Sequence, residues 1–339
     1  MYKLKHLRDL DLSGNYKIEK LPDSISRLQN LYTLRLTGCV NLRELPRGIT
    51  KLVNLRHLYN DGCDHLTYMP RGLGQLTNLQ TLSKFLDKKK GSRLSELSIR
   101  CCPMLTSLPM FPHLEKNLML VNASWKPVQQ TITNASSSSA SSTPIAFSSP
   151  PLSKLKRIYL ERIEDLETLP EDGLQNLISL QHLSIAECRR LKSLSQGVQY
   201  LTALTKLEIR NCRMLDLRND KHGMQWKGLK SLISLQFTGM PKLVSLPLGL
   251  QHVTSLRRLQ ISFCSSLMAI PEWICNWASL EQFTINTCSG LTSLPEAMSR
   301  LTSLEMLRIL DCPILLRRCK RERGEDWPKI AHIPNRYIF

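Results

Sequence analysis

Residues 253–316 consist of three segments that align without gaps: VTSLRRLQISFCSSLMAIPEWICN (253–276), WASLEQFTINTCSGLTSLPEAMSR (277–300) and LTSLEMLRILDCPILL (301–316). They share the pattern LxxLxLxxCxxLxxLPxxI, in which Ile270, Phe283 and Met298 are apolar substitutes of similar size. Leu256, Leu280 and Leu304 occupy one position of the pattern and follow one another at equal intervals. A fixed period of this length indicates a stacked repeat architecture rather than a single globular core.

The same period runs through most of the chain. The lead leucines of the units are Leu7, Leu31, Leu55, Leu79, Leu155, Leu180, Leu204, Leu232, Leu256, Leu280 and Leu304. In each LxL strand the leucines point inward and the residue between them points outward, while the LP corner belongs on an irregular outer arc. Because no unit can bury its own leucines, the units must stack. The sequence therefore predicts an α/β leucine-rich-repeat solenoid, a horseshoe with 12 parallel strands on its concave face and short helices on its convex arc.

Interruptions of the period divide the chain. Residues 110–151 include NASSSSASSTPIAFSSPP, whose Ser/Pro-rich composition predicts a disordered insertion. A longer step, between Leu204 and Leu232, contains the polar stretch 218–228, in which Trp226 is an open candidate for a partner contact. We predict a repeat block at 1–83, an irregular junction at 84–109, the insertion at 110–151, a second repeat block at 152–316 and a basic C-terminal cap at 317–339.

Cysteine usage follows the repeat. Eight of the 11 cysteines occupy the position three residues after the second strand leucine, where Asn15 stands in the first unit. That position needs a small side chain able to bond to neighbouring backbone groups, so we expect reduced structural thiols rather than disulfides. Reduced thiols are typical of an intracellular protein, and we expect a cytoplasmic or nuclear location. No run of apolar residues is long enough to span a membrane.

The net charge of +18 raises the question of a polyanionic partner. Over the five outward positions of the 12 predicted strands there are 13 Lys or Arg and 10 Asp or Glu, a net of only +3. Mixed signs and few aromatic residues argue against a nucleic-acid groove. Two alternatives to a specific recognition module remain. One is a general repeat scaffold, and the other is a binder of nucleic acid or acidic membranes through the basic loops 85–93 and 317–323.

The outward strand positions vary in chemistry, which favours a protein-binding surface over a catalytic pocket. Tyr and Arg are frequent anchors of such surfaces. The candidate protein-binding residues are therefore Arg35, Tyr59, Tyr159, Arg257, Arg258, Phe263 and Arg308. The sequence contains no HExxH, CxxC or GxSxG motif, so we predict neither a metal site nor catalytic residues.

Three phrases connect the chain with one family. They are LTNLQTLSKF (76–85), GSRLSEL (91–97) and CKRERGEDWPKIAHIP (319–334). Together with the LP corners and the cysteine position, they resemble the C-terminal leucine-rich-repeat region of plant coiled-coil nucleotide-binding (NBS-LRR) disease-resistance proteins. The resemblance covers nearly the whole chain except residues 110–151.

The resemblance implies a role in plant innate immunity. In that family the repeat region senses pathogen effectors or host proteins that effectors modify, and it restrains an adjoining nucleotide-binding switch. The present sequence has no GxxxxGK[ST] phosphate loop, so we expect no cofactor on this chain. ADP or ATP would bind only to a nucleotide-binding domain outside it. The expected partners are a pathogen effector or a guarded host protein.

Overall fold

The computed structural model describes residues 6–67, 70, 76, 78, 81–82, 96–103, 105, 114–137, 152–218 and 224–339. The chain forms two compact units, which we describe separately. The first unit comprises Met1–Leu166 and Asp172–Leu180, and the second comprises Glu167–Glu171 and Gln181–Phe339.

The first unit begins with four parallel strands in sequence order. They are β1 (Asp9–Asp11), β2 (Thr33–Arg35), β3 (His57–Tyr59) and β4 (Thr81–Leu82). Leu10, Leu34 and Leu58 are in register, so each repeat places its inward leucine beside the next. The 3-10 helices η1 (Asp23–Arg27) and η2 (Arg47–Lys51) follow the LP corners, where Pro22 and Pro46 have φ of −71° and −65°. The fixed φ of proline ends the extended segment and starts the outer turn.

A second group of parallel strands in this unit corrects one prediction. The strands are β5 (Glu96–Cys102), β6 (Asn117–Ala123) and β7 (Arg157–Glu161), and β6 pairs with both neighbours. It is followed by helix α1 (Lys126–Ser137), while η5 (Leu174–Asn176) follows β7. The prediction that 110–151 is a disordered insertion is therefore wrong for residues 114–137. The rest of that predicted insertion, 110–113 and 138–151, lies outside the described residues, as does most of the predicted junction 84–109.

The reason for the missed elements is their spacing. Leu97 pairs with Leu118, and Leu118 pairs with Ile158. The first interval is shorter than the repeat period and the second is much longer, so a search for the period skips this unit. The segment nevertheless buries Leu118, Leu120 and Trp125, and α1 buries Val128 and Ile132. Burial of those apolar side chains compensates for the entropy of ordering the segment.

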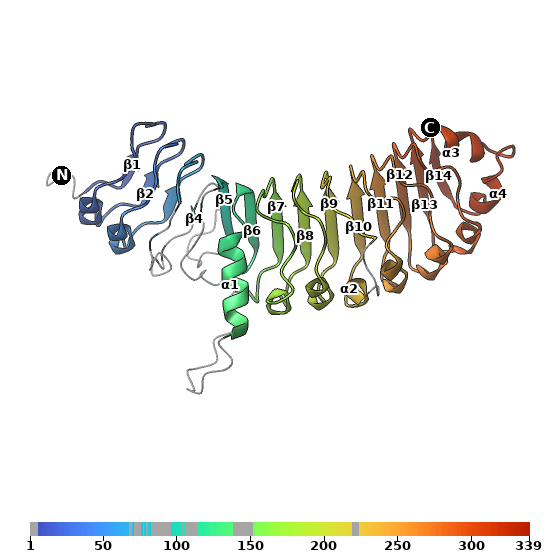
Figure 1. The fold of residues 1–339 in the computed structure, drawn as a ribbon, viewed down its shortest axis with the longest axis horizontal. Coiled ribbons are helices and arrows are strands. Elements are labelled where there is room, and N and C mark those ends of the chain that lie inside the picture. The colour runs from blue at the N-terminus through green and yellow to red at the C-terminus, as the bar shows by residue number, and fades with distance from the viewer. Residues whose placement is uncertain are drawn as a thin grey trace. The chain divides into compact units, whose positions relative to one another are not determined.

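The second unit is a regular stack of seven parallel strands in register (Figure 1). They are β8 (His182–Ala186), β9 (Lys206–Arg210), β10 (Ser234–Thr238), β11 (Arg258–Ser262), β12 (Gln282–Asn286), β13 (Met306–Leu310) and β14 (Asn335–Ile338). Short helices connect them, namely η6 (Gln196–Tyr200), α2 (Met224–Lys227), η7 (Leu248–His252), η8 (Glu272–Asn276), η9 (Glu296–Arg300), α3 (Pro313–Arg318) and α4 (Trp327–Ile330). The predicted solenoid with a parallel sheet and short helical turns is confirmed.

Two further features differ from the sequence interpretation. Strand β6 of the first unit and strand β14 of the second, which pairs in parallel with β13, add to the 12 predicted strands. Trp226 is fully buried in α2. It therefore belongs to the core, and the interpretation of Trp226 as an open candidate for a partner contact is wrong.

Buried cysteines line the stack at the predicted position. The Sγ of Cys39 lies 3.1 Å from the carbonyl oxygen of Leu12, and the Sγ of Cys63 lies 3.3 Å from that of Leu36, so each thiol reaches back to the preceding repeat. Asn15 fills the same role in the first repeat by donating to Leu12 O at 2.8 Å. The nine cysteines whose side chains the structure describes are free thiols. The thiols thus add a second donor to carbonyls of the preceding repeat, since Leu36 O also accepts the backbone N–H of Cys39 at 3.0 Å and Leu12 O accepts from Asn15.

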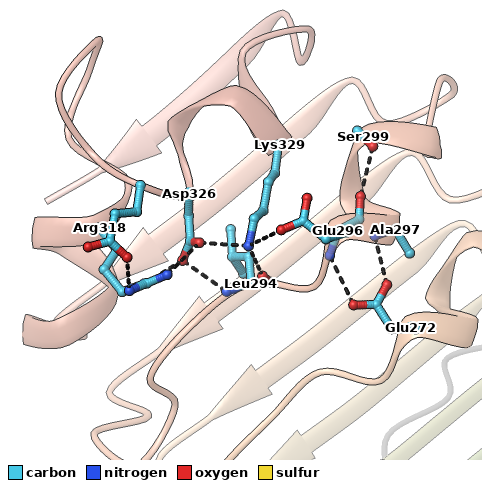
Figure 2. Close-up of polar contacts among 9 residues, drawn as sticks. Glu272, Leu294, Glu296, Ala297, Ser299, Arg318, Asp326 and Lys329 are labelled. Carbon is cyan, nitrogen blue, oxygen red and sulfur yellow. Dashed lines mark hydrogen bonds and ion pairs between the residues drawn. The ribbon is translucent and has the colours of Figure 1, made fainter.

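The C-terminal residues form a polar cap around one buried carboxylate (Figure 2). Asp326 is completely buried and accepts hydrogen bonds from Arg318 Nε, at 3.0 Å, and from the backbone N–H of Leu294, at 3.0 Å. Lys329 Nζ lies 2.8 Å from Asp326 Oδ1 and 3.0 Å from Glu296 Oε1. Burial opposes ionisation of Asp326, but its donors outweigh burial and hold its pKa below the ordinary value. The predicted cap region 317–339 is therefore joined to η9 by ionic contacts.

Candidate functional site

The face of the sheet opposite the buried leucines is the candidate protein-binding surface. In all six strands β8–β13 the second and fourth residues are buried, so the first, third and fifth residues lie on the other face. We call these 18 positions the central rows. The residues immediately before and after each of the six strands are the flanking rows. Parallel pairing in register carries each row from one strand to the next.

In the first unit, the structure brings Arg35 and Tyr59 together. They are partners in the β2–β3 register, and the Arg35 guanidinium carbon lies 4.6 Å from the centre of the Tyr59 ring. His57 stacks on the same ring, with centroids 6.3 Å apart. Such stacking holds the cation and the two rings in one arrangement before any partner binds.

A second stack in this unit escaped the sequence reasoning. The Tyr32 ring lies between the guanidinium groups of Arg8, at 5.5 Å, and Arg56, at 5.1 Å. These three residues precede β1, β2 and β3 at the same repeat position. Comparison of the same outward position in successive repeats would have revealed this Arg-Tyr-Arg series.

Tyr159 lies on β7 and is half-buried. Its register partner is Met119 of β6. The sequence interpretation treated residues 110–151 before this strand as a disordered insertion, whereas β6 of that segment pairs with β7. Tyr159 therefore lies beside a strand that the sequence did not predict.

The four remaining candidates belong to the second unit and differ in their contacts. Arg257, in a flanking row, forms an ion pair with Glu281 at 2.6 Å. Arg258 is exposed at the start of β11, and Arg308 is exposed in the middle of β13. The Arg308 guanidinium carbon lies 5.4 Å from the Tyr337 ring of β14. Because Tyr337 lies in a strand that was not predicted, this pair could not be inferred from the sequence.

Phe263 is held in a strained backbone conformation. It follows β11 with a φ of +55°, and 56% of its surface is exposed. A residue of left-handed conformation follows every strand from β8 to β13, the others being Glu187, Asn211, Gly239, Thr287 and Asp311. The equivalent positions of the first three repeats are glycines, Gly14, Gly38 and Gly62, whereas Asn122 and Arg162 stand there at β6 and β7. A bulky residue in this conformation costs free energy, and such positions often mark functional surfaces.

One carboxylate in the central rows is neutralised by its neighbours. Glu208 of β9 receives Lys206 Nζ at 2.6 Å and lies 3.5 Å from His182 Nε2. The hydrogen bond with His182 and the contacts with Lys206 outweigh burial and lower the Glu208 pKa to about 2. Glu208 thus stays ionised as part of a compact polar cluster that also buries Ser184.

Charges are segregated on the second unit. The central rows contain four cationic residues, Lys206, Arg210, Arg258 and Arg308, and one acidic residue, Glu208, a net of +3. The 12 flanking positions contain one cationic residue, Arg257, and four acidic residues, Glu187, Glu281, Glu305 and Asp311, a net of −3. The total is zero, so a count over all outward positions hides a basic strip between acidic borders.

The first unit does not share this pattern. On β1–β3, the corresponding central positions contain Arg35 against Asp9, Asp11 and Asp61. The basic strip is therefore a property of the second unit and not of the repeat consensus.

The described residues offer neither a metal-binding group nor a membrane-spanning helix. They contain no group of three or more His, Cys, Asp or Glu placed to hold a metal ion. None of their helices has the length and apolar character needed to cross a membrane.

One family model matches the first part of the chain. The family model described as "Leucine-rich repeat region" matches residues 1–112, about a third of the chain. No curated protein matches the sequence. A Leptospira interrogans LRR protein is 20% identical, covers 98% of this chain and 96% of its own, and has a TM-score of 0.35.

Two other solved structures are similar. The leucine-rich repeat domain of the type III effector XopL is 22% identical over 88% of this chain and 74% of its own, with a TM-score of 0.37. The functional domain of InlJ from Listeria monocytogenes, described as including a cysteine ladder, is 18% identical over 91% of this chain and 69% of its own, with a TM-score of 0.34. The repeat period and the parallel strand stack show a leucine-rich-repeat solenoid, and the family model matches a leucine-rich repeat region within residues 1–112.

Proposed function

We propose that this chain is a protein-recognition module that captures a partner on the concave face of its sheet. Leucine-rich-repeat domains are typically protein-binding and generally non-catalytic. The observation that carries the proposal is the row structure of β8–β13, where exposed side chains of varied chemistry stand in register on a rigid sheet. A rigid scaffold lowers the entropy cost of binding because its contact residues are already in place.

The basic C-terminal segment does not favour the nucleic-acid alternative. Arg318 is engaged by Asp326 and Glu325, and Arg321 lies 3.4 Å from Glu322. The other basic loop, 85–93, lies outside the described residues. Two of the five basic residues of 317–323 thus have an acidic partner within the C-terminal segment.

Site-specific photo-crosslinking tests the recognition face. A photoreactive phenylalanine analogue at Gln260, in the central rows, is compared with the same analogue at Leu248, which is 60% exposed on η7. In extracts of plant tissue we expect a discrete crosslinked product from position 260 and none from position 248. A product that forms only from 248, or equally from both, would refute recognition by the concave face.

We also infer a cytoplasmic or nuclear role in plant innate immunity, as the sensor region of a disease-resistance protein whose switch domain binds ADP or ATP. Support comes from the phrase CKRERGEDWPKIAHIP, which contains Asp326 and Lys329 of the buried cap. The part of the chain that most resembles the family is thus an integral part of the last repeats. Sequencing the full-length transcript tests this role: an in-frame phosphate-loop domain upstream is expected, and a transcript without one contradicts it.

A further inference from the structure

We infer that the central rows of β8–β13 bind an extended, acidic polypeptide segment of the partner. The inference rests on the proposed recognition function and specifies the chemistry of the partner. It depends on three features of the second unit: the basic strip, two arginines that form no ion pair with any described carboxylate, and exposed aromatic side chains beside them.

The first feature is the shape of the basic strip. Six strands at about 4.8 Å spacing give a length of about 24 Å, and five residues per strand give a width of about 13 Å. The acidic flanking rows border this strip along both long edges. A single extended chain fits between the borders, whereas the phosphates of a wider polyanion would meet Glu305 and Asp311. Charge complementarity therefore selects a narrow acidic ligand.

The second feature is that two exposed arginines have no acidic partner among the described residues. In the described part of the chain, neither Arg258 nor Arg308 forms an ion pair, whereas Arg257 is paired with Glu281. The residues between them are neutral hydrogen-bonding groups, chiefly Gln260 and Thr284. Two guanidinium groups that lack an acidic partner and are separated by neutral polar side chains are suited to bind carboxylates, since arginine binds a carboxylate through two parallel hydrogen bonds.

The positions of the two arginines predict the spacing of the carboxylates. Arg258 and Arg308 are two strands apart across the sheet and two residues apart along it, which places their Cα atoms about 12 Å from each other. In an extended peptide, side chains on one face recur every second residue, and residues four apart are separated by about 13 Å. The matching ligand has the pattern acid-x-x-x-acid.

The third feature is apolar. Tyr337 is 42% exposed beside Arg308, and Phe339 is 70% exposed at the end of the same edge strand. Met306 and Leu310 are half-buried on either side of Arg308. An apolar residue next to the second carboxylate of the ligand would cover this patch. Exposed aromatic residues near arginines that lack an internal ion pair are the usual composition of an energetic hot spot.

Fluorescence anisotropy with defined peptides tests the inference on the full chain. The probe is the labelled peptide GSESTSEFS, which has two glutamates four residues apart followed by phenylalanine. The controls are GSQSTSQFS, GSKSTSKFS and GSEETSSFS, which change the charge or the spacing. We expect only the first peptide to bind well, with an affinity that falls on going from about 50 to about 300 mM NaCl, because salt screens exposed charge pairs.

Matched variants locate the binding site. The double substitution Arg258→Gln and Arg308→Gln should weaken binding at least about tenfold, and Tyr337→Ala about threefold or more, as expected for anchor residues. Arg300→Gln and Tyr200→Ala change exposed residues of the same types on the turns η9 and η6 and should leave the affinity unchanged. The combination Glu305→Gln with Asp311→Asn should strengthen binding by removing the acidic border.

Several outcomes overturn the inference. Equal binding of the glutamine peptide, or retention of affinity in the arginine double variant, would show that acid recognition by these residues is wrong. Stronger binding of a short DNA duplex than of the acidic peptide would assign the strip to nucleic acid instead. If position 260 crosslinks a partner while the arginine double variant retains that product, the inference fails and the recognition function stands.

Discussion

The carboxylate of Asp326 and the guanidinium of Arg318 form a two-point contact, with Nε–Oδ2 and Nη2–Oδ1 distances of 3.0 and 3.1 Å. The carboxylate is completely buried, and its remaining capacity is used by Lys329 and by the backbone N–H of Leu294. The contact with Arg318 lies within the C-terminal segment, whereas the bonds of Asp326 and Lys329 to Leu294 tie that segment to the repeat that precedes it. The C-terminal segment covers the end of the solenoid, where the core of the last repeat would otherwise be exposed to water.

Removal of this carboxylate should destabilise the second unit strongly. Asp326→Ala removes the buried carboxylate that receives Arg318, Lys329 and the Leu294 N–H, and leaves the two cations only their exposed partners Glu325 and Glu296. We expect a loss of about 3–5 kcal/mol in the free energy of unfolding. Urea unfolding followed by far-UV circular dichroism measures the change. Glu325→Gln is the control, because Glu325 also contacts Arg318 but is 74% exposed, and exposed pairs contribute at most about 1 kcal/mol. Equal effects of the two substitutions would contradict the buried cap.

Glu208 should make the stability of the protein dependent on acid pH. Its pKa is about 2 in the folded chain against an ordinary value of 4.5. A lowered pKa contributes stability that is fully present above pH 4.5 and is lost as the pH falls toward 2. The difference corresponds to about 3 kcal/mol, and it should be absent from Glu208→Gln.

The comparison of wild type with Glu208→Gln isolates this contribution. Asp216 also has a pKa of about 2, held there by Arg218, and it titrates in both proteins. Urea midpoints measured at intervals from pH 5 to pH 2 should therefore converge between the two proteins as the pH falls. Parallel curves over this range would show that Glu208 is not paired as the structure places it.

Buried cysteine thiols should resist alkylation. Burial raises the pKa of Cys63 to about 12, and Cys319 is raised to about 12 for the same reason. At pH 8 the thiolate fraction of such a group is about a thousandfold smaller than that of a thiol with a pKa of 9. Cys275, which is partly exposed, should react first with iodoacetamide.

Mass spectrometry of tryptic peptides follows this reaction residue by residue. Alkylation in about 6 M guanidinium chloride serves as the control, since unfolding should make the three cysteines equivalent. If Cys63 were labelled as fast as Cys275 in the native protein, the repeat around Cys63 would have to open often enough to expose the thiol, which would contradict its burial.

The left-handed positions after the strands should discriminate sharply between residues. Gly62→Ala, where φ is +68° and an added methyl meets only ordinary contacts at 3.5 Å, should cost about 1 kcal/mol from backbone strain. Gly239→Ala, where φ is +62°, should cost more, because the methyl would lie 2.0 Å from Asn211 Oδ1 and would force that side chain to move. Thermal unfolding of the double variant Gly239→Ala, Asn211→Ala separates the two effects. If relief of the Asn211 contact restores no stability, the added cost does not arise there.

Much of this structure followed from the sequence because a constant period makes each unit a copy of the last. The inward leucines, the LP corners and the cysteine column recur at constant offsets, so the LxL rule correctly located 12 of the 14 strands in the described part of the chain. The placement of Arg35 and Tyr59 on one face followed from the same rule, because alternate residues of a strand face opposite sides.

Only the tertiary structure decided the rest. Strand β6 departs from the period on both sides, and β14 joins the sheet through backbone pairing without a leucine pattern. Arg257 pairs with Glu281 while Arg258 forms no ion pair among the described residues, and this contrast depends on which neighbour each long side chain reaches, not on its position in the repeat. The contrast between a net charge of +3 in the central rows and −3 in the flanking rows likewise arises only when the strands pair in the sheet. The repeat period determines the path of the backbone. Charge pairing depends instead on the distances between side chains of neighbouring strands, which are set only when the sheet has folded.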